Sequence, residues 1–282
     1  MSVFERLPIN SLPMSRDRWT PVFVQHGRME VDDSSVRWIS SENEVVPIPI
    51  ATVSAIILGP GTTITHAAVK ACAECKTPIL WTADDGVKFY ACGTPTGSDN
   101  KNALKQVAIY SNKKKRETVA RKMFSLRFGD SQPIDGKSIQ ELMGMEGIRI
   151  RNLYSEMGVK YSVQWRGRKY GDNWDLSDTI NKSISCANSC LYSIVMSVVS
   201  SMGFLPQIGF IHSTGQTPFV YDIADIYKPT TTIEAAFQVA SVNENYNREF
   251  LIERFKEIFE ENMLMKKIPK DIESILSLEE EK

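Results

Sequence analysis

Short apolar runs separated by turn-forming residues make up the N-terminal third of the chain. Runs of about four to eight residues rich in Val, Ile and aromatic residues, bounded by Gly, Pro, Asn or Asp, are typical of β-strands. Their spacing predicts a meander or a small sandwich. Gly59–Thr62 interrupts the strands, and Thr65 can then cap a helix that runs to about Cys75. The predicted strands are Val22–Val24, Met29–Val31, Val36–Ile39, Val45–Ile50, Val53–Leu58, Pro78–Trp81 and Val87–Ala91, with a turn at His26-Gly27.

The period of the apolar positions changes beyond residue 100. Gly93–Asn100 is a cluster of turn formers without apolar periodicity, which is typical of an exposed linker. Apolar residues then recur at helical intervals as far as Phe128, where Gly129 can end a helix. Asp178 can cap a long helix that is apolar on nearly every side. The pattern predicts an α+β protein: a β-rich domain over residues 1–92, a linker over 93–100, and a larger all-α domain over 101–282.

Composition narrows the class of protein. The chain has 282 residues, of which 42% are hydrophobic, and its apolar runs fall short of the roughly 18 to 20 residues that cross a bilayer. Met1–Trp19 lacks the pattern of a signal peptide. The five cysteines are an odd number, and Cys72-Ala-Glu-Cys75 lacks the second ligand pair that a zinc site requires. We therefore expect a cytoplasmic protein with free thiols and no membrane contact.

Charge is unevenly distributed along the chain. The net charge is −1, yet residues 101–170 carry 16 Lys and Arg against 6 Asp and Glu, whereas residues 241–282 carry 7 against 11. Within the basic segment, Trp165–Tyr170 mixes cations with aromatic rings, a combination that suits a phosphate backbone with bases available for stacking. A solvated helix face explains Lys113–Arg116 equally well. The segment is a candidate nucleic-acid contact.

Asp222 and Asp225 form the first candidate site for chemistry. They lie three residues apart, so on a helix both carboxylates project from one face. A divalent cation between or beside them is one reason to hold two like charges together, because hard oxygen ligands suit magnesium and manganese. The alternative is an exposed acidic pair that water solvates.

His212 and Glu146 are further candidates. His212 follows a buried-looking extended segment, Ile208–Ile211, and precedes a polar turn, so it is either a metal ligand or a hydrogen-bonded structural histidine. Glu146 lies between Gly144 and Gly147, which leave room for a bulky group, at the head of an amphipathic helix. Its alternative interpretation is a first-turn glutamate that stabilises the helix dipole.

Eight separate stretches, in order and at matching spacing, resemble the CRISPR-associated integrase family, the Cas one proteins, and most closely the branch that accompanies type I-E systems. The similarity covers the chain apart from about its last 30 residues, and scattered agreement of this kind is not expected by accident. The matching stretches are Leu58–Thr62, Thr65–Val69, Gly144–Gly147, Trp165–Tyr170, Asp178–Asn181, Ser189–Tyr192, Gly209–His212 and Phe219–Asp225.

The resemblance implies an N-terminal β domain, a helical catalytic domain, and one Mg²⁺ or Mn²⁺ ion held by Glu146, His212 and Asp225. Asp222 matches a further acidic position beside the metal. Tyr170, Tyr192 and Tyr221 match tyrosines near the DNA and the reacting phosphate. The resemblance thus implies that Tyr192, Tyr221 and Asp222 are catalytic together with the metal ligands. The expected DNA-binding residues are Arg151, Arg168, Tyr170, Lys228, Lys88 and His26. At the position of His26, a tyrosine of relatives braces the end of the duplex, so this chain departs from that pattern.

The implied reaction is transesterification, in which the 3′ hydroxyl of a short double-stranded DNA fragment attacks a phosphodiester at the edge of a CRISPR repeat. With water as the nucleophile, the same site is an endonuclease. The resemblance also implies a homodimer that works with a second Cas protein, although the tail lacks the proline-rich extension of some relatives. Two alternatives remain: a stand-alone metal-dependent nuclease for branched DNA, and a non-catalytic DNA-binding scaffold.

Overall fold

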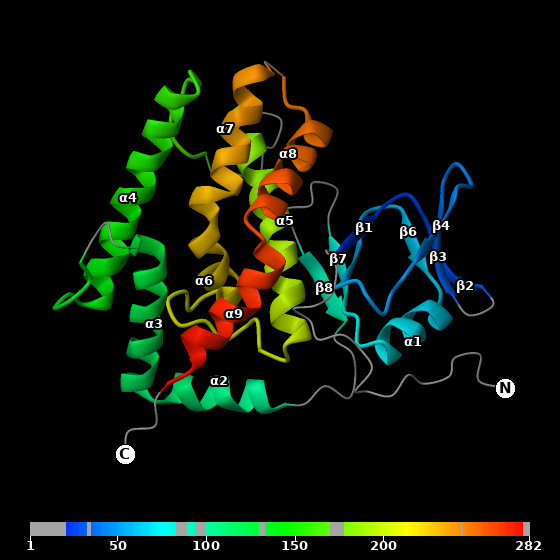
Figure 1. The fold of residues 1–282 in the computed structure, drawn as a ribbon, viewed down its shortest axis with the longest axis horizontal. Helices are drawn as coiled ribbons and strands as arrows, with labels where there is room; N and C mark the ends of the chain where they lie inside the picture. The colour runs from blue at the N-terminus through cyan, green and yellow to red at the C-terminus, as the bar shows by residue number, and fades with distance from the viewer. Residues whose placement is uncertain are drawn as a thin grey trace. The chain divides into compact units, whose positions relative to one another are not determined.

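The strands lie in the N-terminal third of the chain and the long helices follow them (Figure 1). The computed structural model describes residues 21–32, 35–82, 89–93, 100–129, 133–169, 178–243 and 245–278. Two compact units divide the chain: residues 1–105, 193–205 and 265–269 form the first, here called the β unit, and residues 106–192, 206–264 and 270–282 form the second, here called the helical unit. The α+β class predicted from the sequence is confirmed. The domain boundary at 93–100 stays a prediction.

One four-stranded sheet of the β unit has the order β4-β3-β2-β6. β2 pairs antiparallel with β3 and β3 with β4, as a meander requires, whereas β2 pairs parallel with β6. Sequence analysis missed β6, because its three residues follow two glycines and contain a single apolar side chain. The strands are β2 (Gly27–Asp32), β3 (Ser35–Ser40), β4 (Val45–Ile48) and β6 (Thr62–Ile64).

The other four-stranded sheet has the order β1-β5-β7-β8. Its β1/β5 and β5/β7 pairs are parallel and only β7/β8 is antiparallel, so a simple meander is not the topology. The strand predicted to start at Val53 begins at Ile56. All three residues of β5 are buried, which explains its unbroken apolar run. The strands are β1 (Val22–Val24), β5 (Ile56–Leu58), β7 (Ile79–Thr82) and β8 (Phe89–Gly93).

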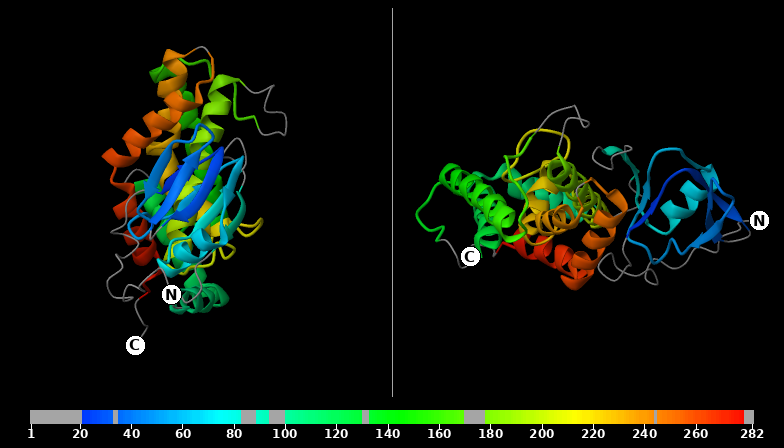
Figure 2. Two further views of the ribbon diagram at one scale, coloured as in Figure 1. Left: turned by 90° about the vertical axis from the view of Figure 1, so that its right-hand side faces the viewer. Right: turned by 90° about the horizontal axis from the view of Figure 1, so that it is seen from above.

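Both sheets and helix α1 (His66–Glu74) share one apolar core (Figure 2). Met29 and Ile56, one from each sheet, are both 0% exposed. The helix contributes small side chains, among them Ala68 and Cys72. The Thr65 side chain accepts a hydrogen bond from the Ala68 backbone N–H at 3.3 Å, which confirms the predicted N-cap.

The helical run that was predicted to end at Gly129 is divided by Asn112. The Asn112 side chain accepts from the Lys115 N–H at 3.1 Å and so caps a new helix. Gly129 ends that helix with a φ of 56°. The helices beyond residue 100 are α2 (Lys101–Ser111), α3 (Lys113–Phe128), α4 (Ile139–Lys160), α5 (Thr179–Ser201), α6 (Pro218–Tyr227), α7 (Thr232–Val242), α8 (Arg248–Glu261) and α9 (Leu264–Leu276), with a 3₁₀ turn at Lys228–Thr230.

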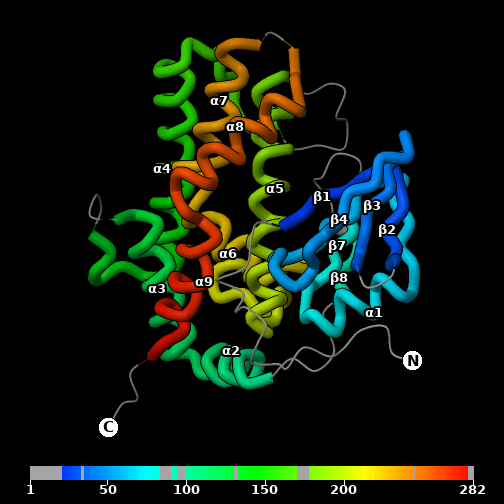
Figure 3. The backbone as a smooth tube through the Cα atoms, turned by 45° about the vertical axis from the view of Figure 1, so that its right-hand side comes forward, coloured from blue at the N-terminus to red at the C-terminus, as the bar shows by residue number. Residues whose placement is uncertain are grey.

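α5 is the apolar helix that the sequence predicts, and Asp178 caps it by accepting from the Asn181 N–H at 2.9 Å. It is the one helix among the described residues that is long and apolar enough to cross a membrane, yet 83% of its most apolar stretch is buried inside the protein. Helix α7 lies beside α5 (Figure 3). Ile180 and Ile184 of α5 pack against Ile233 and Phe237 of α7. α5 is therefore a buried core helix.

Candidate active site

Glu146 lies in the second turn of α4. Ser138 caps this helix in a reciprocal capping box with Glu141, so the helix starts earlier than predicted and its first-turn acid is Glu141. The helix-dipole interpretation of Glu146 is therefore wrong. A Cβ built on Gly144 or Gly147 meets no atom within 4 Å, so both glycines face open space beside the glutamate.

Arg127 of α3 holds the Glu146 carboxylate. Its Nη1 donates to Glu146 Oε2 at 2.6 Å, and its Nη2 donates to the backbone oxygen of Asp222 at 2.8 Å and lies 3.7 Å from Asp225 Oδ2. The Arg127 side chain is 0% exposed. Sequence analysis counted Arg127 within the basic segment and did not place it at the candidate site. The available signal was its place on the apolar stripe Val119, Met123, Arg127, where a cation is unexpected unless it has a partner.

The Asp222 carboxylate organises the loop before α6. It is 0% exposed and accepts from the backbone N–H groups of Phe210 at 2.5 Å, Ile211 at 3.0 Å and His212 at 2.9 Å. A Cβ on Gly209 would lie 2.4 Å from the His212 oxygen and 2.9 Å from Asp222 Oδ2, so only glycine fits there. The segment 208–211, predicted as a strand or extended piece, is a loop wrapped around this carboxylate.

The His212 imidazole lies between the two aspartates of α6. Its Nδ1 is 2.7 Å from Asp222 Oδ1, and its Nε2 is 3.7 Å from Asp225 Oδ2. The buried carboxylate fixes the imidazole with Nδ1–H pointing inward and leaves Nε2, on a side chain that is 39% exposed, free for a ligand. A cation between Asp222 and Asp225, one of the arrangements considered from the sequence, is thus excluded by the ring that occupies this space.

Lys228 and two tyrosines complete the wall of the site. Lys228 Nζ lies 2.5 Å from Asp225 Oδ1 and 4.7 Å from the centre of the Tyr192 ring. Tyr192 and Tyr221 meet edge to face at 4.9 Å, and Tyr221 approaches the His212 ring at 6.0 Å. Two predicted catalytic tyrosines, the histidine and a predicted DNA-contacting lysine therefore lie together.

The charges of the site are set by burial and pairing. Burial raises the pKa of Glu146, and Asp225 raises it further against the opposing effect of Arg127. Burial alone would raise the pKa of Asp225, but Lys228 and Arg127 outweigh it and the pKa is lowered. The hydrogen bond to Asp222 raises the pKa of His212. Asp225 is consequently ionised near neutral pH, whereas Glu146 is the more easily protonated carboxyl.

The residues fit a divalent cation in their chemistry. Two carboxylates and an imidazole oriented by a second carboxylate are ligands that Mg²⁺ and Mn²⁺ accept. The 3.7 Å between His212 Nε2 and Asp225 Oδ2 suits neighbouring ligands, which lie about 3 to 4 Å apart when each bond to the ion is about 2.1 Å. No three acidic, histidine or cysteine side chains of the described residues already surround one point. Glu146 must turn from Arg127 to join the other two.

The predicted DNA-contacting residues have different surroundings. Arg168 donates through Nη1 to Asn181 Oδ1 at 2.8 Å and through Nη2 to Ser185 Oγ at 2.7 Å, and so fastens its segment to α5. Arg151 is exposed on α4, and His26 is exposed in the β unit with a φ of 54°. DNA contact remains a prediction for all three. Lys88 and Tyr170 lie outside the described residues.

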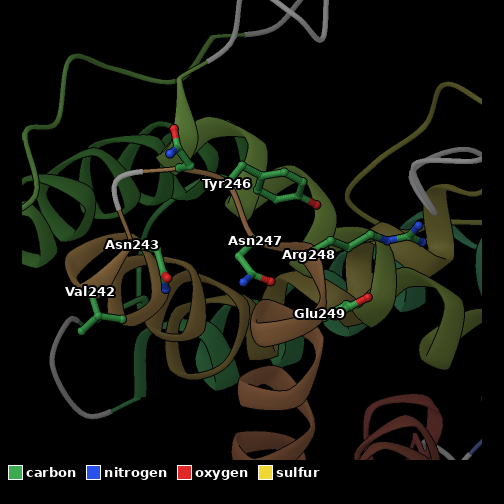
Figure 4. Close-up of a pocket in the computed structure, with 7 residues that line it drawn as sticks. Val242, Asn243, Tyr246, Asn247, Arg248 and Glu249 are labelled. Carbon is green, nitrogen blue, oxygen red and sulfur yellow. The ribbon is translucent and has the colours of Figure 1, made fainter.

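A pocket of about 510 Å³ lies at the start of α8, where the Tyr246 ring and the Arg248 side chain form part of its lining (Figure 4). Its other lining residues are Val242, Asn243, Asn245, Asn247 and Glu249. None of the predicted site residues lines this pocket. The charged cluster on α3, α4 and α6 is therefore the candidate active site.

Comparisons with known proteins identify relatives of the whole chain. The model of the family described as CRISPR associated protein Cas1 matches residues 22–133 and 127–272. The chain is 42% identical to CRISPR-associated endonuclease Cas1 2 of Chlorobaculum tepidum over 94% of this chain and 90% of that protein. It is 36% identical to CRISPR-associated endonuclease Cas1 of Escherichia coli over 96% of this chain and 88% of that protein. A solved structure described as a TtCas1-DNA complex is similar at a TM-score of 0.72 and 28% identity, over 94% of this chain and 98% of that one.

Proposed function

This chain belongs to the CRISPR-associated Cas1 family, and we propose that it is a cytoplasmic integrase of spacer acquisition, dependent on Mg²⁺ or Mn²⁺. Its enzyme class is that of the relatives named endonucleases, a DNA nuclease or integrase. The proposed reaction joins the 3′-hydroxyl ends of a short double-stranded DNA fragment to a CRISPR repeat by transesterification. Hydrolysis of a phosphodiester is the same chemistry with water as the nucleophile.

The orientation of His212 is the observation that carries the proposal. Asp222 binds Nδ1 of the ring, whereas Nε2 faces Asp225 at 3.7 Å, which is beyond hydrogen-bond distance. A carboxylate behind an imidazole is the usual support of a histidine that binds a metal. Glu146 supplies the third ligand of the proposed site, in agreement with the resemblance.

Each residue has a separate task in the proposed mechanism. His212, Asp225 and Glu146 would hold the cation, which when bound acidifies the attacking hydroxyl and stabilises charge at the reacting phosphate. Asp222 is a positioning residue, because both its oxygens are occupied by the loop 210–212. Lys228 keeps a positive charge beside Asp225, where it can attract a phosphate oxygen.

The proposed partners follow from the family. The solved TtCas1 structure described as a DNA complex supports DNA binding, and the basic segment 101–170 offers cations for a phosphate backbone. We propose a homodimer that works with the second Cas protein of the adaptation complex. Membership of the branch that accompanies type I-E systems is part of the same proposal.

The first prediction tests the reaction through His212→Ala. Labelled fragments with 3′-hydroxyl ends are incubated with a repeat-bearing plasmid, the second Cas protein and Mn²⁺, and joined products are counted. We expect joining to fall by more than about 100-fold, since even the indirect supports of metal ligands are worth about 10- to 100-fold. Binding of the fragment should persist, because the imidazole belongs to the metal site and makes no phosphate contact in this proposal.

His66→Ala is the matched control, because His66 is exposed on α1 of the β unit. It should join fragments as the unchanged protein does. Cleavage of branched DNA without joining by the unchanged protein would favour the stand-alone nuclease. Joining that survives in His212→Ala would contradict the proposed metal site. DNA binding by the unchanged protein without joining or cleavage would favour the non-catalytic scaffold.

A further inference from the structure

A buried cation already lies among the carboxylates of the site. The Arg127 guanidinium bonds the Glu146 carboxylate at 2.6 Å and lies 3.7 Å from that of Asp225. Of the three other cationic or potentially cationic groups, Lys228 pairs with Asp225 from its other oxygen, His212 is bonded to Asp222, and Arg149 of α4 attracts Glu146 and Asp225 electrostatically. Arg127 is therefore the one group of the described residues that touches Glu146 with a positive charge at hydrogen-bond distance.

The surroundings of Arg127 are specific for a guanidinium group. Nη1 and Nη2 reach a side chain and a backbone oxygen on two different helices, which the single ammonium of a lysine does not reproduce. The Phe124 ring lies 5.5 Å from the guanidinium carbon. Nε is buried without a hydrogen-bond partner. The unsatisfied N–H is unfavourable, so the charge of Arg127 and its two other hydrogen bonds have to offset it.

Electrostatics gives Arg127 a double effect on a divalent cation. Burying Glu146 and Asp225 together is unfavourable unless a positive charge stands near them. Arg127 supplies that charge, so the carboxylates can be folded into place before an ion arrives. The same guanidinium is bonded to Glu146 Oε2 and repels an incoming cation, so it competes with the ion for this carboxylate.

We propose that Arg127 is a built-in counter-ion of the metal site, which stabilises the unloaded carboxylates and weakens binding of the divalent cation by competing for Glu146. The inference rests on the metal site of the proposed function. It concerns folding and affinity, so its test does not depend on DNA joining. Arg127 is a positioning residue in this proposal and has no contact with substrate.

Arg127→Met is the second prediction, read out by thermal unfolding with and without Mn²⁺ and by calorimetric titration with Mn²⁺. Without the ion, the melting temperature should fall, because Glu146 loses its hydrogen-bonded counter-ion and Asp225 loses a nearby cation while it keeps Lys228. Mn²⁺ should then raise the melting temperature by more than it does in the unchanged protein. The affinity for Mn²⁺ should increase by about 10-fold, which corresponds to ~1.4 kcal/mol.

Arg121→Met is the matched control on the same helix. Arg121 is also an arginine of α3 that bonds to protein oxygens, those of Ile134 and Lys137, but it lies outside the site. Its loss should lower the melting temperature and leave the affinity for Mn²⁺ unchanged. Equal or weaker Mn²⁺ binding by Arg127→Met than by the unchanged protein would overturn the proposal.

A double variant keeps the test decisive if Arg127→Met does not fold. In Arg127→Met with Glu146→Gln, the unpaired charge is removed together with its partner, so the double variant should fold with a higher melting temperature than Arg127→Met. A double variant that is no more stable than the single one overturns the counter-ion. DNA joining separates the two proposals: failure of the unchanged protein to join DNA rejects the function, whereas unchanged Mn²⁺ affinity in Arg127→Met rejects only the counter-ion.

Discussion

The core of the β unit and the charged centre of the helical unit bury their side chains for different reasons. In the β unit, Met29, Ile56 and Leu58 are at most 1% exposed and meet other apolar groups. In the helical unit, the equally buried Arg127 and Asp222 meet charged and polar groups. Apolar burial stabilises a fold directly, whereas buried charges approximately balance desolvation against pairing. The first region should therefore control stability and the second should control chemistry.

The largest effect is expected from a substitution in the apolar core of the β unit. Ile56→Ala removes three carbons from a fully buried position in β5 and should lower the free energy of unfolding by about 2 to 5 kcal/mol. The measurement is chemical denaturation. Mn²⁺ affinity should not change in the folded variant. Ile148→Ala is the control, because Ile148 is 57% exposed on α4 and its truncation should cost no more than about 0.5 kcal/mol. Similar losses for both variants would contradict the assignment of the core.

Asp222→Asn tests the charged side with a smaller expected effect. Each carboxylate oxygen of Asp222 accepts two hydrogen bonds, and an amide accepts at only one of the two positions. Either the N–H groups of Phe210 and Ile211 or the N–H and Nδ1–H of His212 therefore lose their acceptor, and the loop holds His212 less firmly. We expect the affinity for Mn²⁺ to fall by about 10- to 100-fold, measured by calorimetric titration. Asp271→Asn is the control, since Asp271 accepts from the Tyr227 hydroxyl at 2.7 Å outside the site. Unchanged affinity in Asp222→Asn would reject its positioning role.

The smallest effects are expected at Arg168 and Arg151, two arginines to which sequence analysis gave the same DNA-contacting role. Arg168 is bonded to Asn181 and Ser185, so Arg168→Ala should cost about 1 to 2 kcal/mol of stability. Arg151 is exposed, so Arg151→Ala should leave stability within about 0.5 kcal/mol and reduce the slope of log affinity for DNA against log salt by about 0.9 per lost phosphate contact. Denaturation and salt-dependent DNA binding separate the two roles. An unchanged salt slope in Arg151→Ala would remove it from the DNA contacts.

Local pattern predicted much of the fold correctly. The switch from short apolar runs to helical spacing predicted the α+β class, and Thr65 and Asp178 were recognised as caps because capping depends on neighbours in the chain. β6 was missed because a short parallel edge strand depends on its partner β2 more than on its own composition. The start of α4 was predicted near Glu146, whereas the helix begins at Ile139. The capping-box residues Ser138 and Glu141 were available in the sequence as a signal for this start.

Within the candidate site, the sequence by itself determined which groups are available: the carboxylates of Glu146, Asp222 and Asp225, the imidazole of His212, and the spacing that places two aspartates on one face of α6. Only the tertiary structure decided their roles. It placed the imidazole between the aspartates, occupied Asp222 with backbone N–H groups, and brought Arg127 from α3 to Glu146 on α4. The reason is physical: periodicity acts over one or two helical turns, whereas the distance between charges on different helices follows from how those helices pack.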